Sequence, residues 1–226
     1  KGVVITVGVL IVLAIALLVL PRFLFKTPQN TDTTEQGGST TQENSNQTAN
    51  TTTDVFPLTT NEMETLAAQA TKEFDFAFTK AREWREDALF IAALAQYEES
   101  IKPALGKNTY VFLSPSLADF YWTLEIDQTK NSGGENDFQR IIYYREDYFL
   151  PQQVVAVPMQ YWQLSYLDAL RLADKLGGKD MRRTYPKYDV NVLLSAQEDR
   201  YLTWDIEYLV DGQSVFSTSV NAFDGS

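Results

Sequence analysis

Hydrophobic and polar positions follow three successive patterns along this chain. Residues 2–20 are apolar throughout except for Thr6, residues 27–55 are almost entirely polar, and residues 56–226 show helical and strand periods. An apolar run of nineteen residues forms a helix roughly 28 Å long, close to the hydrocarbon thickness of a bilayer. The first pattern therefore predicts a transmembrane helix at 2–20, within an anchor of residues 1–26.

A cleaved signal peptide is the alternative interpretation of the apolar run. The only A-x-A pattern, at residues 14–16, lies inside the run rather than after it, and this favours an uncleaved span. Only three charged residues flank the run and bear on its orientation in the membrane: Lys1 precedes it, and Arg22 and Lys26 follow it. Counted by the positive-inside rule, these charges favour a cytoplasmic C-terminal part.

The polar segment that follows gives the opposite indication. Thr, Ser, Asn and Gln occupy twenty of the twenty-nine positions from 27 to 55, and such a composition predicts a flexible tether with a mean reach of about 30 Å. Thr-rich segments of this kind are typical of the outer side of membranes. We therefore expect a single-pass protein of the cell membrane whose folded part lies outside the cytoplasm.

The apolar positions of residues 56–150 indicate one helix and a set of strands. Apolar side chains repeat at helical spacing from about 61 to 84, and Thr59 or Thr60 can cap the first turn. Strands are expected where apolar residues run together or alternate, at residues 88–97, 110–113, 117–126 and 138–144.

Residues 151–226 repeat this order of elements. A capping box formed by Ser165 and Asp168 begins a helix that the Gly177-Gly178 pair is expected to end. Strands are expected after this helix, at residues 188–194, 202–209 and 214–221. The second half therefore predicts one helix followed by three strands.

Two tryptophans indicate that the halves are related. Trp122 and Trp204 lie 82 residues apart in the similar strand sequences WTLEI and WDIEY. Coincidence between two amphipathic strands is the alternative explanation. The shared order of elements favours a tandem repeat and an α+β fold, in which residues 56–150 and 151–226 form two small modules. Each module is expected to pack a helix on a three-stranded antiparallel sheet.

The second half also contains a recognisable series of motifs. The helix SYLDALRLADKLGG is followed by a strand with Trp204 in LTWDIEYL and by the closing segment VNAFDG at 220–225. In this order the second half resembles a PepSY domain, while residues 61–149 are similar in outline but end in IIYYREDYF without the alanine-glycine close. The resemblance implies a noncatalytic module at or outside the cell surface that binds peptides or inhibits peptidases.

Composition removes many kinds of chemistry. The chain has no Cys and no His, so thiol nucleophiles, His-based triads, haem and zinc sites with nitrogen or sulfur ligands are excluded. Residues 56–226 carry 26 acidic and 16 basic groups, which repel phosphate backbones, so we expect no nucleic-acid partner. Paired carboxylates such as Asp205 and Glu207 alternate along a strand, as on a solvated face. We therefore expect no catalytic residue, no metal site and no cofactor.

Aromatic residues between the two halves are the candidates for ligand contact. Tyr161, Trp162 and Tyr166 lie in an irregular stretch, where their rings contact a ligand or pack between domains. We expect a membrane-anchored, noncatalytic binding module, with the lipid bilayer at residues 2–20 and a peptide, peptidase or envelope protein as partners. A structural or assembly protein of the cell envelope is one alternative, and a carboxylate-based hydrolase is another.

Overall fold

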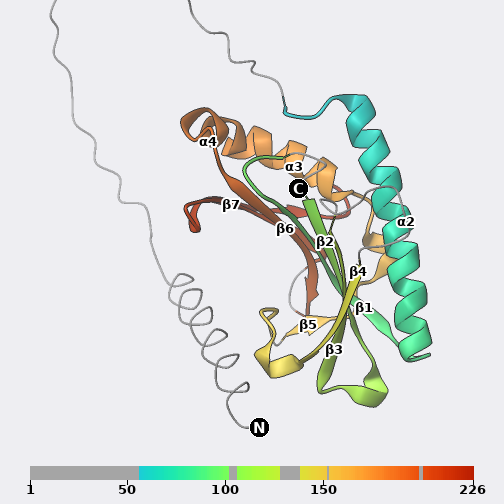
Figure 1. Cartoon of the computed structure of the whole chain (residues 1–226). Helices are drawn as coiled ribbons and strands as arrows, with labels where there is room; N and C mark the ends of the chain where they lie inside the picture. The colour runs from blue at the N-terminus through green and yellow to red at the C-terminus, as the bar shows by residue number, and fades with distance from the viewer. Residues whose placement is uncertain (1–55, 102–105, 128–137, 152, 199–200) are drawn as a thin grey trace, which may run out of the picture. The chain divides into compact units, whose positions relative to one another are not determined.

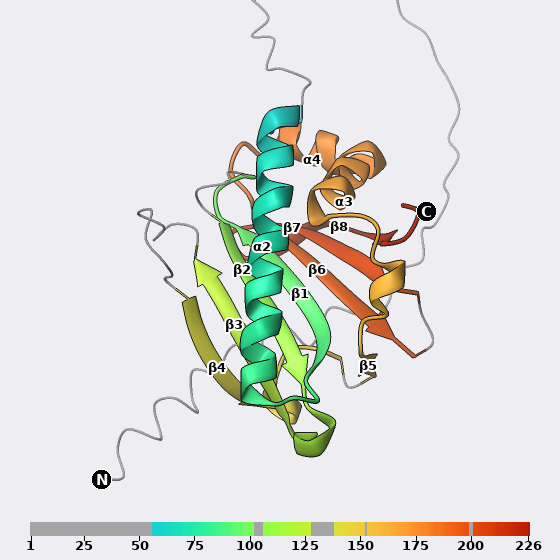
Figure 2. The same cartoon turned by 90° about the vertical axis from the view of Figure 1, so that its right-hand side faces the viewer.

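The structure, a computed structural model, describes residues 56–101, 106–127, 138–151, 153–198 and 201–226. Its helices are α2 (Thr60–Trp84), α3 (Tyr166–Ala173) and α4 (Lys179–Thr184). Its strands are β1 (Leu89–Tyr97), β2 (Gly106–Leu113), β3 (Phe120–Asp127), β4 (Phe138–Tyr144), β5 (Val154–Val155), β6 (Asp189–Gln197), β7 (Thr203–Val210) and β8 (Gln213–Asn221). The helices lie on one face of the sheet (Figures 1 and 2).

All of these strands belong to a single antiparallel sheet. The order across the sheet is β4-β3-β2-β1-β6-β7-β8, and the short β5 pairs with β6. The centre of the sheet joins the two halves of the sequence, because β1 pairs with β6 from Ala92 opposite Ser195 to Tyr97 opposite Val190. Helix α2 packs on β2 and β3, whereas α3 packs on β6, β7 and β8.

The predicted fold of two modules with separate three-stranded sheets is therefore wrong. The first half contributes four strands, β1–β4, and they continue without a break into β6–β8. The physical reason lies in β1, whose side chains are buried on both faces of the sheet: Phe90 and Ala93 on one face, Ile91 and Ala92 on the other. A strand buried on both faces belongs in the middle of a sheet rather than at the edge of a small one.

The expectation of a membrane-spanning helix has no counterpart in the part of the chain that the structure describes. No helix there is both long and apolar enough to cross a membrane. The predicted span at 2–20, the anchor 1–26 and the tether 27–55 lie outside the described residues. The location outside the cytoplasm rests on those residues and stays a prediction.

The helix starts follow the predicted caps. Thr59 accepts a hydrogen bond from the Glu62 N–H, and the Glu62 carboxylate accepts one from the Thr59 N–H at 2.7 Å. Ser165 and Asp168 form the same reciprocal pair at the start of α3. The predicted stop at Gly177 is only a kink, because its φ of 130° breaks the helix and the chain then continues into α4.

Trp122 and Trp204 do not occupy equivalent positions in the sheet, although their strand sequences are similar. Trp122 lies on β3, the third strand of the first half, whereas Trp204 lies on β7, the second long strand of the second half. The order of helix followed by strands does recur, as α2-β1-β2-β3 and α3-β6-β7-β8 with α4 added. The sequence similarity around the two tryptophans therefore does not reflect equivalent positions.

Candidate functional site

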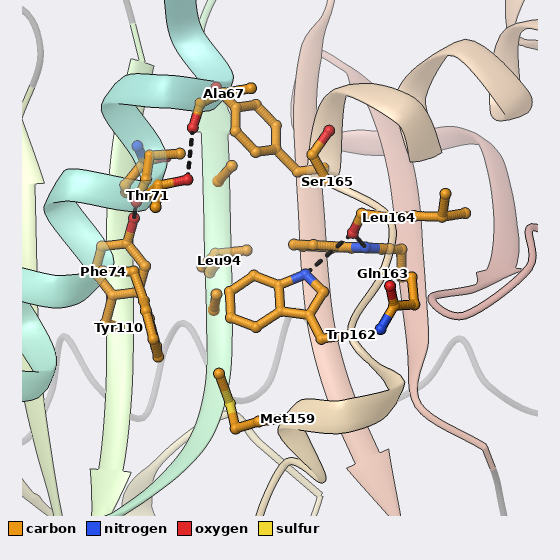
Figure 3. Close-up of a pocket in the computed structure, with 16 residues that line it drawn as sticks. Ala67, Thr71, Phe74, Leu94, Tyr110, Met159, Trp162, Gln163, Leu164 and Ser165 are labelled. Carbon is orange, nitrogen blue, oxygen red and sulfur yellow. Dashed lines mark hydrogen bonds between the residues drawn. The ribbon is translucent and has the colours of Figure 1, made fainter. Parts of the chain in front are cut away.

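A pocket of about 290 Å³ opens between α2, the central strand β1 and the segment that leads into α3 (Figure 3). Residues of α2 and β2 lie on one side of it, and Met159 with residues 162–166 lies on the other. An engineered apolar cavity of about 150 Å³ holds one benzene molecule. The pocket therefore has room for about two small rings, or one large apolar side chain.

Alanines create this space. Ala93 and Ala95 of β1 form the sheet side of the pocket, and Ala67 and Ala70 of α2 form the helix side. Alanine is depleted in strands, and elsewhere the same face of the sheet carries large side chains such as Phe112. Because the alanines do not reach across the gap between α2 and the segment before α3, the gap stays open.

Aromatic rings form the walls. Phe74 of α2 contacts the rings of Tyr110 and Trp162, with centroids 5.9 and 5.2 Å apart. Trp162 in turn stacks on Phe90 at 5.4 Å and lies 6.2 Å from Trp204. Each ring is supported by at least one other ring, so the walls keep their shape without a ligand.

The backbone carbonyl of Leu164 fixes both tryptophans. The indole N–H of Trp162 donates to it at 3.0 Å, and the indole N–H of Trp204 donates to it at 2.9 Å. The N–H of Leu164 donates to the Ala222 carbonyl at 2.9 Å, and so does the N–H of Gln163 at 3.0 Å. These bonds attach the segment before α3 to the end of β8 and hold that wall in place.

The pocket offers few free polar donors. The hydroxyl of Thr71 donates to the Ala67 carbonyl at 3.0 Å, that of Tyr110 donates to the Ala70 carbonyl at 3.2 Å, and that of Ser165 donates to Asp168. None of the described residues that line the pocket carries a charge. A ligand in this pocket would therefore be recognised mainly by its shape and apolar surface.

A cluster of tyrosines lies at one end of the pocket. Tyr97 and Tyr166 stack with centroids 6.3 Å apart, and Asn108 donates to the Glu73 carboxylate at 2.7 Å beside them. Burial raises the pKa of the Tyr166 hydroxyl to about 12. Burial also raises the pKa values of Tyr97 and Tyr110, and each is raised further by nearby charges, including that of Glu73. These hydroxyls stay neutral at physiological pH.

The three residues predicted to contact a ligand divide between two places. Trp162 and Tyr166 line the pocket, one on its aromatic wall and the other at its tyrosine end. Tyr161 does not line it: the side chain is 52% exposed and its ring contacts Phe223 at 6.0 Å. The structure thus brings two of the three residues together.

Sequence reasoning missed the residues that make the space. The expected strand at 88–97 begins with ALFIAALAQ, in which four of the nine residues are alanine. An alanine-rich strand inside an aromatic-rich domain is a signal that something approaches closely or that a cavity is present. That signal marks Ala93 and Ala95 but does not show which helix faces them.

The acidic pair Asp205 and Glu207 does not line the pocket. Asp205 and Glu207 alternate with Trp204 and Ile206 along β7, and the two apolar side chains belong to the core on the helix face. Asp205 accepts a hydrogen bond from the Ser219 hydroxyl at 2.5 Å. Among the described residues, no group of three or more acidic side chains is placed to hold a metal ion.

No protein-family model, no curated protein and no solved structure matches this chain. The resemblance of the second half to a PepSY domain therefore stays a prediction.

Proposed function

We propose that this protein is a noncatalytic binding module whose pocket takes one large apolar side chain of a peptide partner. The observation that carries the proposal is the space of about 290 Å³ that Ala93 and Ala95 leave open beneath supported aromatic walls. Natural cores are packed with few voids larger than a water molecule, so an open apolar space of this size costs stability unless something fills it.

The size of the pocket also indicates how tightly it binds. Burying an aromatic side chain removes about 200 Å² from water, which is worth about 5 kcal/mol at 25 cal/mol per Å². Association costs at least about 4 kcal/mol in lost translation and rotation. A single side chain therefore binds only weakly, and useful affinity requires a longer ligand that makes further contacts outside the pocket.

The charge of the protein further limits the kind of partner that it can bind. The pocket lining is uncharged, whereas residues 56–226 carry 26 acidic groups against 16 basic ones. The surrounding field opposes an anionic ligand and favours a neutral or basic one. An apolar side chain presented by a neutral or basic peptide fits both the pocket and its surroundings.

The proposal is tested by nuclear magnetic resonance on the purified protein, using the indole N–H signals of Trp162 and Trp204. The probes are the N-acetyl amides of tryptophan, leucine and lysine. We expect the tryptophan and leucine amides to shift both signals and the lysine amide to leave them in place. The variant Ala93→Leu places a larger side chain in the space beside β1 and is expected to abolish the shifts.

A purely structural module gives a different result. It predicts that no probe shifts the two indole signals, or that all three probes shift them equally in both the original protein and Ala93→Leu. Either result would rule out the pocket as a specific binding site.

A further inference from the structure

Strand β8 leaves one edge of the sheet unpaired among the described residues, since it follows β7 and no described strand follows it. Asn221 shows which backbone groups point outward. Its N–H donates to the Ser226 carbonyl and its carbonyl accepts from the Gly225 N–H, both at 2.9 Å. Inward and outward groups alternate along an antiparallel strand. The N–H and C=O groups of Ser219 and Ser217 therefore also point to the free edge.

The free stretch of this edge has defined ends. The register between β7 and β8 shifts between Tyr208 and Leu209, which leaves Val215 as an extra residue on β8. Such a bulge interrupts regular pairing, and at the other end Asn221 is already bonded to the C-terminal turn. A strand added from outside therefore pairs with the stretch 216–220, through the four outward groups of the two serines.

The charged side chains of β7 and β8 are all acidic. Residues 201–226 contain four acidic side chains and no Lys or Arg. Glu207 lies directly opposite Ser217, and Asp205 lies directly opposite Ser219. Serine side chains are short, and an added strand lies about 10 Å from β7, two strand spacings away. A Lys or Arg side chain on that strand can extend over a serine to the carboxylate behind it.

The opposite side of the edge carries exposed and half-buried apolar side chains. Phe216 contacts the Tyr208 ring with centroids 5.7 Å apart and is only partly buried. Leu176, in the kinked turn between α3 and α4, is 60% exposed. Alternate residues of an added strand would lie on this side, where apolar side chains extend the core.

We propose that the edge of β8 binds an extended, basic segment of a protein partner, which adds to the sheet as a further strand. Its Lys or Arg residues alternate with apolar ones, the basic side chains facing Asp205 and Glu207 and the apolar ones facing Phe216. A second copy of this chain fits poorly, because its own β8 would bring the same acidic residues to the interface. Main-chain hydrogen bonds supply affinity and the alternating side chains supply specificity.

This inference goes beyond the proposed function and does not depend on it. No residue of β8 lines the pocket, which lies on the other side of β7. The two sites can therefore be tested separately in one protein.

The test measures the binding of a fluorescein-labelled nonapeptide of alternating lysine and valine to the purified protein by fluorescence anisotropy. Ser217→Pro removes an N–H that points outward from the sheet. An edge strand tolerates proline at such a position, but an added strand loses a hydrogen-bond donor there. We expect Ser217→Pro to weaken binding at least about tenfold, while the matched variant Ser217→Ala, which keeps the N–H, binds within about twofold of the original. In the original protein, the peptide should slow hydrogen exchange at the Ser217 and Ser219 amides.

A second pair of variants distinguishes binding at the β8 edge from general attraction of a basic peptide to an acidic protein. Asp205→Asn combined with Glu207→Gln should weaken binding about fivefold and reduce its salt dependence. The matched pair Glu64→Gln with Glu98→Gln removes two exposed charges elsewhere and should change little.

Four results would overturn the inference. They are unchanged binding to Ser217→Pro, an equal loss in the Glu64 and Glu98 control, loss of binding in Ala93→Leu, which would place the peptide in the pocket, and a dimer of this chain that Ser217→Pro dissociates. Because the exchange measurement uses the unaltered protein, the test does not depend on the folding of any variant.

Discussion

Trp122 and Trp204 lie in similar strand sequences but belong to two different regions of the helix-covered face. Trp122 stacks on Trp84 of α2 at 6.2 Å and contacts Phe112 at 5.7 Å, so large rings pack against one another in that region. Trp204 lies 6.2 Å from Trp162 at the wall of the pocket, where alanines leave space. Both tryptophans are almost fully buried, at 4% and 2% exposure. Burial alone therefore does not distinguish a core residue from a pocket residue.

The largest expected difference between the two regions is in stability. Trp122→Ala removes a ring from the filled region and should lower the free energy of unfolding by about 3–5 kcal/mol. Trp162→Ala removes a partly exposed ring from the pocket wall and should cost about 1–2 kcal/mol. Urea denaturation measures both values, and equal losses would show that the pocket wall is ordinary core.

Two neighbouring alanines of β1 sharpen the comparison. Ala92 is fully buried on the face away from the helices, where Ala92→Leu overpacks a filled cluster and should cost about 1–3 kcal/mol. Ala93 borders the pocket, so Ala93→Leu should change the unfolding free energy by less than about 1 kcal/mol while abolishing ligand binding. The same urea measurement decides the point: a large loss in Ala93→Leu would mean that no usable space exists there.

The local elements could be predicted from the sequence because short-range signals define them. The Thr59 and Ser165 caps begin α2 and α3 as expected, and the predicted strand at 138–144 has the bounds of β4. Each of these signals lies within a few residues along the chain.

The sheet and the pocket could not be predicted in the same way. The pairing of Ala92 with Ser195 spans 103 residues (195 − 92), and no local pattern specifies which buried strand lies beside which. The pocket depends on four alanines of α2 and β1 meeting a wall from the segment before α3. Trp162 and Tyr166 are candidates from the sequence only because aromatic rings in an irregular stretch are well placed to contact a ligand.

The effect that is smallest near neutral pH is a pH dependence at the tyrosine end of the pocket, because it appears only above about pH 10. Burial raises the pKa of Tyr166 to about 12, whereas an unfolded tyrosine titrates near 10. The native state is unaffected below pH 10 and loses stability as the pH rises from 10 through 12, because unfolding then releases a proton. The loss from this one group is on the order of 2 kcal/mol.

The variant Tyr166→Phe isolates this contribution. It should flatten the decline in unfolding free energy between pH 10 and 12 without changing its slope below pH 10. Denaturation at a series of pH values measures the slope, and Tyr144→Phe, an exposed tyrosine on β4, serves as the control. An identical decline in Tyr166→Phe would show that this hydroxyl is not buried in solution.

The most direct test of the central claim is a crystal structure of the protein soaked with indole. The pocket is open because alanines border it, so indole should occupy the space beside Ala93 and Ala95, against the wall that contains Trp162. A crystal of Ala93→Leu soaked in the same way should show no indole there. An empty pocket in the original protein, with indole absent or bound elsewhere, would contradict the account.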